Sequence, residues 1–291
     1  MPEPARSEVD CSELDCSELD CSELDCSEPA RSGLDWPGLA EPDRPVDFAG
    51  LLAELGASAA RLCADLASLT DRQAREPSLL PGWSRGHVLT HLARSADAYR
   101  WMLALARTGS APGPRADADE LDRRLREGAG RAAGALVDDL RDGLDGLLRD
   151  AAQLPVGRRD VLVPALAGWR HPAWYLLWRA WRELEVHAVD LDLGRGPADW
   201  PATFVRAALA ETAAASAVRS VPVARVEAED LGRSWVIGGA GPVVSGPGHA
   251  LLAWFAGRGP LTGLRVAGGQ SEPLVPPVLP AWPLPPVPGW G

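Results

Sequence analysis

The chain of 291 residues contains no lysine, so arginine supplies nearly all of its basic charge. Residues 1–30 hold ten acidic side chains and one arginine, a net charge of −9, which leaves −2 of the formal −11 for the other 261 residues. A nearly neutral folded part has no basic field to attract nucleic acid. No apolar run reaches the roughly 20 residues of a membrane span, and the acidic N-terminus lacks the pattern of a signal peptide. We therefore expect a cytoplasmic protein that binds neither nucleic acid nor membrane.

Cysteine is scarce outside one tract near the N-terminus. Four of the five cysteines belong to a five-residue repeat, Cys-Ser-Glu-Leu-Asp, and are Cys11, Cys16, Cys21 and Cys26. This spacing does not match the paired cysteines of zinc modules, and a cytoplasmic chain keeps such thiols reduced. The composition predicts a disordered acidic repeat tail and linker over residues 1–45, the alternative being a tract that binds metal or is redox-active. Cys63 is expected to be a small buried hydrophobe, so none of the five looks like a nucleophile.

Apolar residues at helical spacing predict a mainly α protein. We expect helices over residues 46–70, 84–107, 117–152, 172–194 and 204–218. The third is interrupted near Gly128, and Pro172 suits the first helical position of the fourth, which Gly194 closes. The fourth helix carries a heavy apolar face: Trp174, Leu177, Trp178, Trp181, Leu184 and Leu191.

After residue 222 the pattern changes to short β-like runs separated by glycines. Strands are expected at residues 223–226, 234–237, 242–244 and 264–267, with an apolar helix at 249–256. The sequence therefore predicts a helical bundle over residues 46–220 and a small α+β domain over residues 221–270. Residues 271–291 are rich in proline and tryptophan and are expected to form an extended tail.

Two histidines stand one turn apart in the stretch Leu80-Pro-Gly-Trp-Ser-Arg-Gly-His-Val-Leu-Thr-His-Leu-Ala-Arg94. The Pro-Gly pair indicates a turn, and Ser84 is a good N-cap because its hydroxyl can accept from an otherwise unpaired amide. A helix that begins there places His87 and His91 on one face. Two imidazoles with this spacing form one half of a site for a first-row metal.

The other half is expected from the tryptophan-rich helix, in which Glu183 and His187 are four residues apart. Two imidazoles and one carboxylate, with a position left for water or substrate, suit catalytic zinc and also accommodate nickel, cobalt or iron. The alternatives are a packed or exposed His91 and an ordinary surface pair on the second helix. Three further carboxylates could replace Glu183 as the ligand: Glu185, Asp190 and Asp192. Asp190 and Asp192 approach the helix end, however, and can be solvated there.

Three stretches resemble those of the mycothiol-dependent maleylpyruvate isomerase family. They are the double-histidine stretch, Arg182-Glu-Leu-Glu-Val-His-Ala-Val-Asp-Leu191, and Leu251-Leu-Ala-Trp-Phe-Ala-Gly-Arg258. The resemblance covers approximately residues 46–268. It implies a DinB-like four-helix bundle followed by a small α+β domain.

Carried over position by position, the resemblance places the zinc ligands of the family at His91, Glu183 and His187. His87 matches a histidine that is not the expected ligand and would pack against or support the site. Family members often have a second histidine where this chain has Ala188, and this loss falls on a position that is not a ligand. The catalytic arginine of the family maps to Arg258, with two rivals, Arg233 and Arg265.

The function that the resemblance implies is a zinc-dependent enzyme with mycothiol as thiol cofactor, either a maleylpyruvate isomerase or an S-transferase. Its substrate would be a small-molecule electrophile or an unsaturated acid. One alternative is a metal-dependent hydrolase on the same bundle, which would use metal-activated water. Another is a helical ligand-binding or regulatory protein without catalysis, with an apolar pocket lined by Trp174, Trp178 and Trp181.

Overall fold

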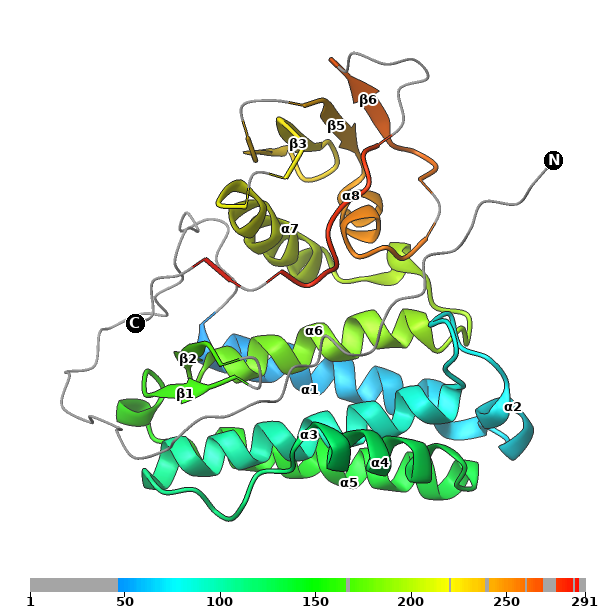
Figure 1. The fold of residues 1–291 in the computed structure, drawn as a ribbon, viewed down its shortest axis with the longest axis vertical. Helices are drawn as coiled ribbons and strands as arrows, with labels where there is room; N and C mark the ends of the chain where they lie inside the picture. The colour runs from blue at the N-terminus through cyan, green and yellow to red at the C-terminus, as the bar shows by residue number, and fades with distance from the viewer. Residues whose placement is uncertain are drawn as a thin grey trace. The chain divides into compact units, whose positions relative to one another are not determined.

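The computed structural model describes residues 47–165, 168–219, 221–238, 241–259, 261–268, 276–284 and 286–287 (Figure 1). The predicted tail over residues 1–45, with its four cysteines, lies outside these described residues, as does the start of the predicted C-terminal tail. Within the described ranges, no helix combines the length and the apolar character needed to cross a membrane.

The described chain is mainly helical, with short strands, which confirms the predicted fold class. Its α-helices are α1 (Phe48–Asp65), α2 (Asp71–Arg75), α3 (Arg85–Thr108), α4 (Ala118–Ala129), α5 (Ala133–Ala152), α6 (Tyr175–Asp190), α7 (Ala202–Ala217) and α8 (Gly248–Phe255). Its strands are β1 (Leu162–Pro164), β2 (Arg170–Pro172), β3 (Arg225–Ala228), β4 (Arg233–Val236), β5 (Val243–Gly246) and β6 (Arg265–Ala267). The break predicted near Gly128 separates α4 from α5.

The predicted start and end of the fourth helix were wrong. Pro172 ends β2, which pairs antiparallel with β1, and α6 begins at Tyr175. The helix ends at Asp190, because Asp192 adopts a left-handed conformation with φ of 52°. The short helix α2 was not predicted, since five residues are too few to show a period. It is instead stabilised by a capping box between Thr70 and Gln73.

The chain divides into two compact units, and the division cuts through α1 and α6. One unit contains Ala59–Ala180, and the other contains the described residues up to Ser58 and from Trp181 onward. The boundary predicted at residue 220 stays a prediction.

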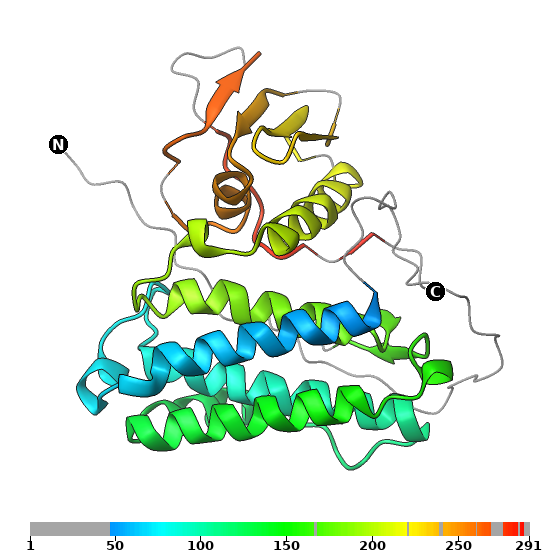
Figure 2. The same ribbon diagram turned by 180° about the vertical axis from the view of Figure 1, so that it is seen from behind.

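In the first unit, α3 packs against α4 and α5, and both views show α3 and α5 side by side (Figures 1 and 2). The approach is close at the start of α3, where a Cβ atom on Gly86 would run into the carbonyl oxygen of Ala129. Two ion pairs tie the outer faces of α3 and α5 together, Arg94 with Asp139 and Arg100 with Asp150. The helix that carries His91 is therefore held along its length.

In the second unit, four strands form one sheet in the order β4-β3-β5-β6. The β3–β5 pair is parallel, and its two neighbouring pairs are antiparallel. Helix α8 packs against α7, β3 and β5. The apolar face expected on the fourth helix has residues in both units, and all six are buried: Trp174, Leu177, Trp178, Trp181, Leu184 and Leu191.

Residues 276–284 lie against other parts of the second unit. The indole N–H of Trp282 donates to the hydroxyl of Thr212 on α7 (2.9 Å), and that of Trp254 on α8 donates to the carbonyl of Pro277 (3.2 Å). The guanidinium of Arg182 lies 5.6 Å from the centroid of the Trp282 ring and forms a buried ion pair with Glu211. This C-terminal segment thus contacts α6, α7 and α8.

Candidate metal centre

The start of α3 is fixed by Ser84 and His87. Ser84 caps the helix, as predicted, and its hydroxyl accepts from the backbone N–H of His87. The Nδ1 atom of His87 accepts from the backbone N–H of Ser84 (3.2 Å) and contacts the Ser84 hydroxyl (2.8 Å). Burial lowers the pKa of His87, which favours the neutral ring that this capping box requires. His87 thus holds the helix terminus.

One turn further along α3, His91 is half-buried beside Trp83. The ring centroids of Trp83 and His91 lie 5.6 Å apart, and the same indole lies 6.2 Å from the ring of His87. Trp83 therefore packs against both histidines of the predicted half-site and limits how their rings can rotate.

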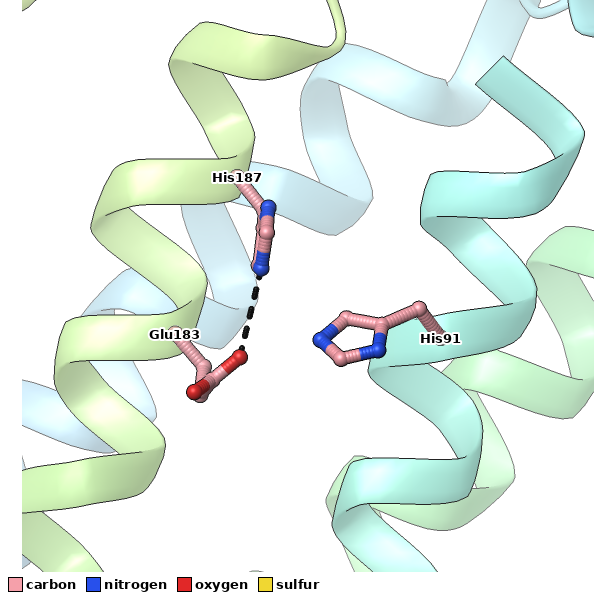
Figure 3. Close-up of side chains that lie close together, drawn as sticks. All are labelled: His91, Glu183 and His187. Atoms are coloured by element: carbon pink, nitrogen blue, oxygen red, sulfur yellow. Dashed lines mark ion pairs between the residues drawn. The ribbon is translucent and has the colours of Figure 1, made fainter. Parts of the chain in front are cut away.

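The structure brings His91, Glu183 and His187 together, as Figure 3 shows. One nitrogen or oxygen atom from each of the three side chains lies within 4.8 Å of the other two. Glu183 and His187 occupy successive turns of α6, and the Nε2 atom of His187 lies 3.3 Å from a carboxylate oxygen of Glu183. All three side chains are half-buried, so that a small ligand can still reach them.

Asp190, one turn beyond His187, is completely buried. Its carboxylate accepts from His187 Nδ1 (2.8 Å) and from Arg258 Nε (3.0 Å) and Nη2 (2.9 Å). Burial alone would raise the pKa of Asp190, but the hydrogen bonds from His187 and Arg258 lower it below its ordinary value. The expectation that Asp190 is solvated at a helix end was wrong, because Arg258 covers and neutralises it.

An ionised Asp190 can only accept hydrogen bonds, so Nδ1 of His187 carries the proton and Nε2 faces Glu183. Burial alone would lower the pKa of His187, but its hydrogen bonds to Asp190 and Glu183 raise it. The site therefore favours a positive charge at the Nε2 edge of His187, whether the charge is a proton or a cation.

The other rival carboxylates lie in different surroundings. Glu185 is buried, and its carboxylate accepts from the indole N–H of Trp181 at 3.1 Å. Its backbone carbonyl accepts from the indole of Trp200 at 2.9 Å, so Glu185 fastens two tryptophans to α6. Asp192 is exposed.

Among the three candidate arginines, Arg258 is joined to His187 through Asp190. It follows α8, and its Nη1 also donates to the carbonyl of Ala256 at 2.7 Å. Arg233 lies in β4, and Arg265, in β6, forms an ion pair with Glu229. Sequence patterns did not reveal the link between Asp190 and Arg258. The only signal was the presence of both residues in the stretches that resemble the family.

The fold and the cluster define a mainly helical protein with a His/Glu/His donor set. Residues 55–192 match a family described as the mycothiol maleylpyruvate isomerase N-terminal domain. Two crystal structures are similar to the chain, one of the mycothiol-dependent maleylpyruvate isomerase and one of a histidine-to-alanine mutant of it. Each has a TM-score of 0.73 and 22% identity, and each comparison covers 81% of this chain and 98% of the solved chain. No curated protein matches the sequence.

Residues 55–192 therefore form an N-terminal domain of the mycothiol maleylpyruvate isomerase type, which confirms the resemblance seen in the motifs of this region. The solved structures show in addition that the fold extends over most of the chain.

Proposed function

We propose that the protein is a zinc-dependent enzyme that uses mycothiol as its thiol cofactor, as an isomerase of unsaturated acids or an S-transferase. The observation that carries the proposal is the His91, Glu183 and His187 cluster with Asp190 hydrogen-bonded behind it. The family and the similar solved structures support the isomerase and mycothiol parts.

The residues of the cluster fit a divalent metal ion. Two imidazole nitrogens and one carboxylate oxygen are a usual ligand set for catalytic zinc, which leaves one position for a further ligand. A carboxylate bonded to the second ring nitrogen of a ligating histidine is the common supporting arrangement, and Asp190 occupies that place on His187. Zinc in such a site lowers the pKa of a coordinated thiol, so that mycothiol would be available as a thiolate near neutral pH.

The residues of the chain have separate tasks in this proposal. Asp190 holds the Nδ1 proton of His187 and so directs Nε2 toward the metal position. Arg258 neutralises Asp190 and, with three of its five N–H groups used, keeps two for a substrate oxygen. That position suits the catalytic role that the family resemblance gives to Arg258.

The described part of the chain offers no reactive thiol of its own. Cys63 is its free cysteine, and burial raises the pKa of the half-buried Cys63 thiol, which favours the protonated, less reactive form. This favours a thiol brought in by a cofactor over a protein nucleophile. The reaction would take place in the cytoplasm, on a small electrophile or an unsaturated acid such as maleylpyruvate.

The proposal is tested by the zinc content of the purified full chain beside that of Glu183→Ala. We expect about one zinc per wild-type chain and nearly none in the variant, because two imidazoles alone hold zinc weakly. Asp192→Asn, which removes an exposed charge close by in sequence, is the matched control and should keep its zinc. No metal in the wild type, even after zinc is supplied, would contradict the proposal. Zinc-loaded protein that turns over equally well without mycothiol would contradict the thiol part and favour a hydrolase.

A further inference from the structure

Arg179, on α6, carries a charge that no carboxylate of the described chain neutralises. Its Nη1 lies 3.2 Å from Nε2 of His171, and its guanidinium carbon lies 5.4 Å from the ring centroids of both Tyr99 and Trp169. A half-buried guanidinium whose direct contacts among the described residues are all with neutral side chains is unusual, because arginine is mostly exposed or paired with an acid.

His171 is neutral in this arrangement. It is completely buried, and its Nδ1 lies 2.9 Å from the carbonyl oxygen of Pro172. A carbonyl can only accept, so Nδ1 carries the hydrogen and Nε2 accepts from Arg179. The bond orients the guanidinium without compensating its charge.

One edge of the Arg179 guanidinium remains open. The Nε and Nη2 atoms have no acceptor among the described residues, yet they are not among the buried polar atoms that lack a partner, so solvent reaches them. This is an edge on which arginine binds a carboxylate through two parallel hydrogen bonds. The aromatic contacts with Tyr99 and Trp169 favour the cation and hold its plane.

The position of Arg179 relates it to the candidate metal centre. Residues 179, 183 and 187 are spaced by four along α6, so that they lie on one helix face, about 6 Å apart per step along the axis. A short acid with its reacting carbon near Glu183 could therefore extend a carboxylate toward Arg179.

We propose that Arg179 is the anion subsite of the protein and binds a carboxylate of a small organic acid. The choice of an unsaturated acid as substrate rests on the proposed function, whereas the anion subsite rests on the contacts of Arg179 alone. Arg258 and Arg179 then divide two tasks. Arg258, bound to Asp190, keeps its remaining N–H groups for the reacting part of the substrate, while Arg179 presents its open edge to a carboxylate of the substrate.

The test uses maleate, a dicarboxylate with a cis double bond, and measures its binding by calorimetry at constant ionic strength. The full chain is first freed of metal with a chelator, so that maleate cannot bind through zinc. We expect Arg179→Gln to weaken maleate binding by about tenfold or more, since it removes a charged, two-point hydrogen bond. Arg179→Lys keeps the charge but loses the planar fork, and should weaken binding less. Arg170→Gln, at an exposed arginine of β2, is the matched control and should bind as the wild type does.

Equal affinity of the wild type and Arg179→Gln for maleate would overturn the anion subsite, as would the absence of maleate binding by the wild type with and without zinc. If Arg179→Gln fails to fold, as judged by circular dichroism, Arg179→Lys decides, and unchanged affinity in it would also overturn the inference. Maleate binding that depends on Arg179 in a protein that takes up no zinc would support the subsite and contradict the proposed function. A protein that takes up zinc but binds maleate independently of Arg179 would support the proposed function and contradict the anion subsite.

Discussion

His171 lies in β2, just before α6, and His187 lies in the last turn of α6. Both carry their hydrogen on Nδ1, yet their surroundings are opposite. The Nδ1 of His171 donates to a neutral carbonyl, and its Nε2 is occupied by the Arg179 cation. The Nδ1 of His187 donates to a buried carboxylate, and its Nε2 faces a second carboxylate, that of Glu183. The same tautomer thus orients the Arg179 cation at His171 and favours a cation from outside the protein at His187. Because the tautomer is the same at both sites, the difference between the two histidines comes from the charge of the groups that contact their ring nitrogens.

Arg258→Ala should produce the largest effect at the His187 side. We expect the zinc content to stay near that of the wild type, since the three donor side chains remain. Turnover with mycothiol should fall about 10²–10³-fold, as is typical when a donor to developing negative charge is removed. The measurement is zinc content together with the initial rate, and Arg265→Ala is the control at another arginine of the second unit. A rate equal to that of the wild type would remove Arg258 from the catalytic residues.

Asp190→Asn should have an intermediate effect, because it keeps the shape and removes the charge behind His187. We expect zinc affinity to fall about 10–100-fold, the usual cost of losing a supporting carboxylate. The measurement is competition with a chromophoric chelator, with Asp192→Asn as the exposed control. If the affinity did not change, the charge of Asp190 would not be what separates His187 from His171.

His171→Gln should have the smallest effect and should leave the metal alone. We expect the free energy of unfolding to fall by about 1–3 kcal/mol, because the buried hydrogen bonds to the Pro172 carbonyl and Arg179 are weakened or lost. Urea denaturation measures this change, and zinc content should equal that of the wild type. Loss of zinc with an unchanged free energy of unfolding would contradict the view that only His187, and not His171, serves the metal centre.

The sequence predicted those parts of the molecule that depend on neighbours close in the chain. Ser84 as N-cap of α3 and the break between α4 and α5 follow from local chemistry, and the structure has both. The spacing of Glu183 and His187 placed both on one face of a helix, and the resemblance joined them to His91.

The parts that the sequence did not predict depend on distant partners. Pro172 lies in a strand because β2 pairs with β1 ten residues earlier, an arrangement that helix signals do not register. Asp190 is buried because Arg258, 68 residues further along, covers the end of α6. The open edge of Arg179 depends on Tyr99 and Trp169, which come from two other segments.

The C-terminal segment that contacts Thr212 and Arg182 through Trp282 has a consequence for how the chain can be altered at its end. The few contacts of this segment would bind the same peptide only weakly if it were separate from the chain. A tethered segment, however, meets its docking surface at an effective concentration in the millimolar range, so weak contacts keep it bound. A chain shortened before Pro277 would lose that intramolecular ligand and uncover the Arg182–Glu211 ion pair, directly beside Glu183 in sequence. Affinity tags and fluorescent labels therefore belong beyond this segment, where they extend the tether and leave its docked part in place.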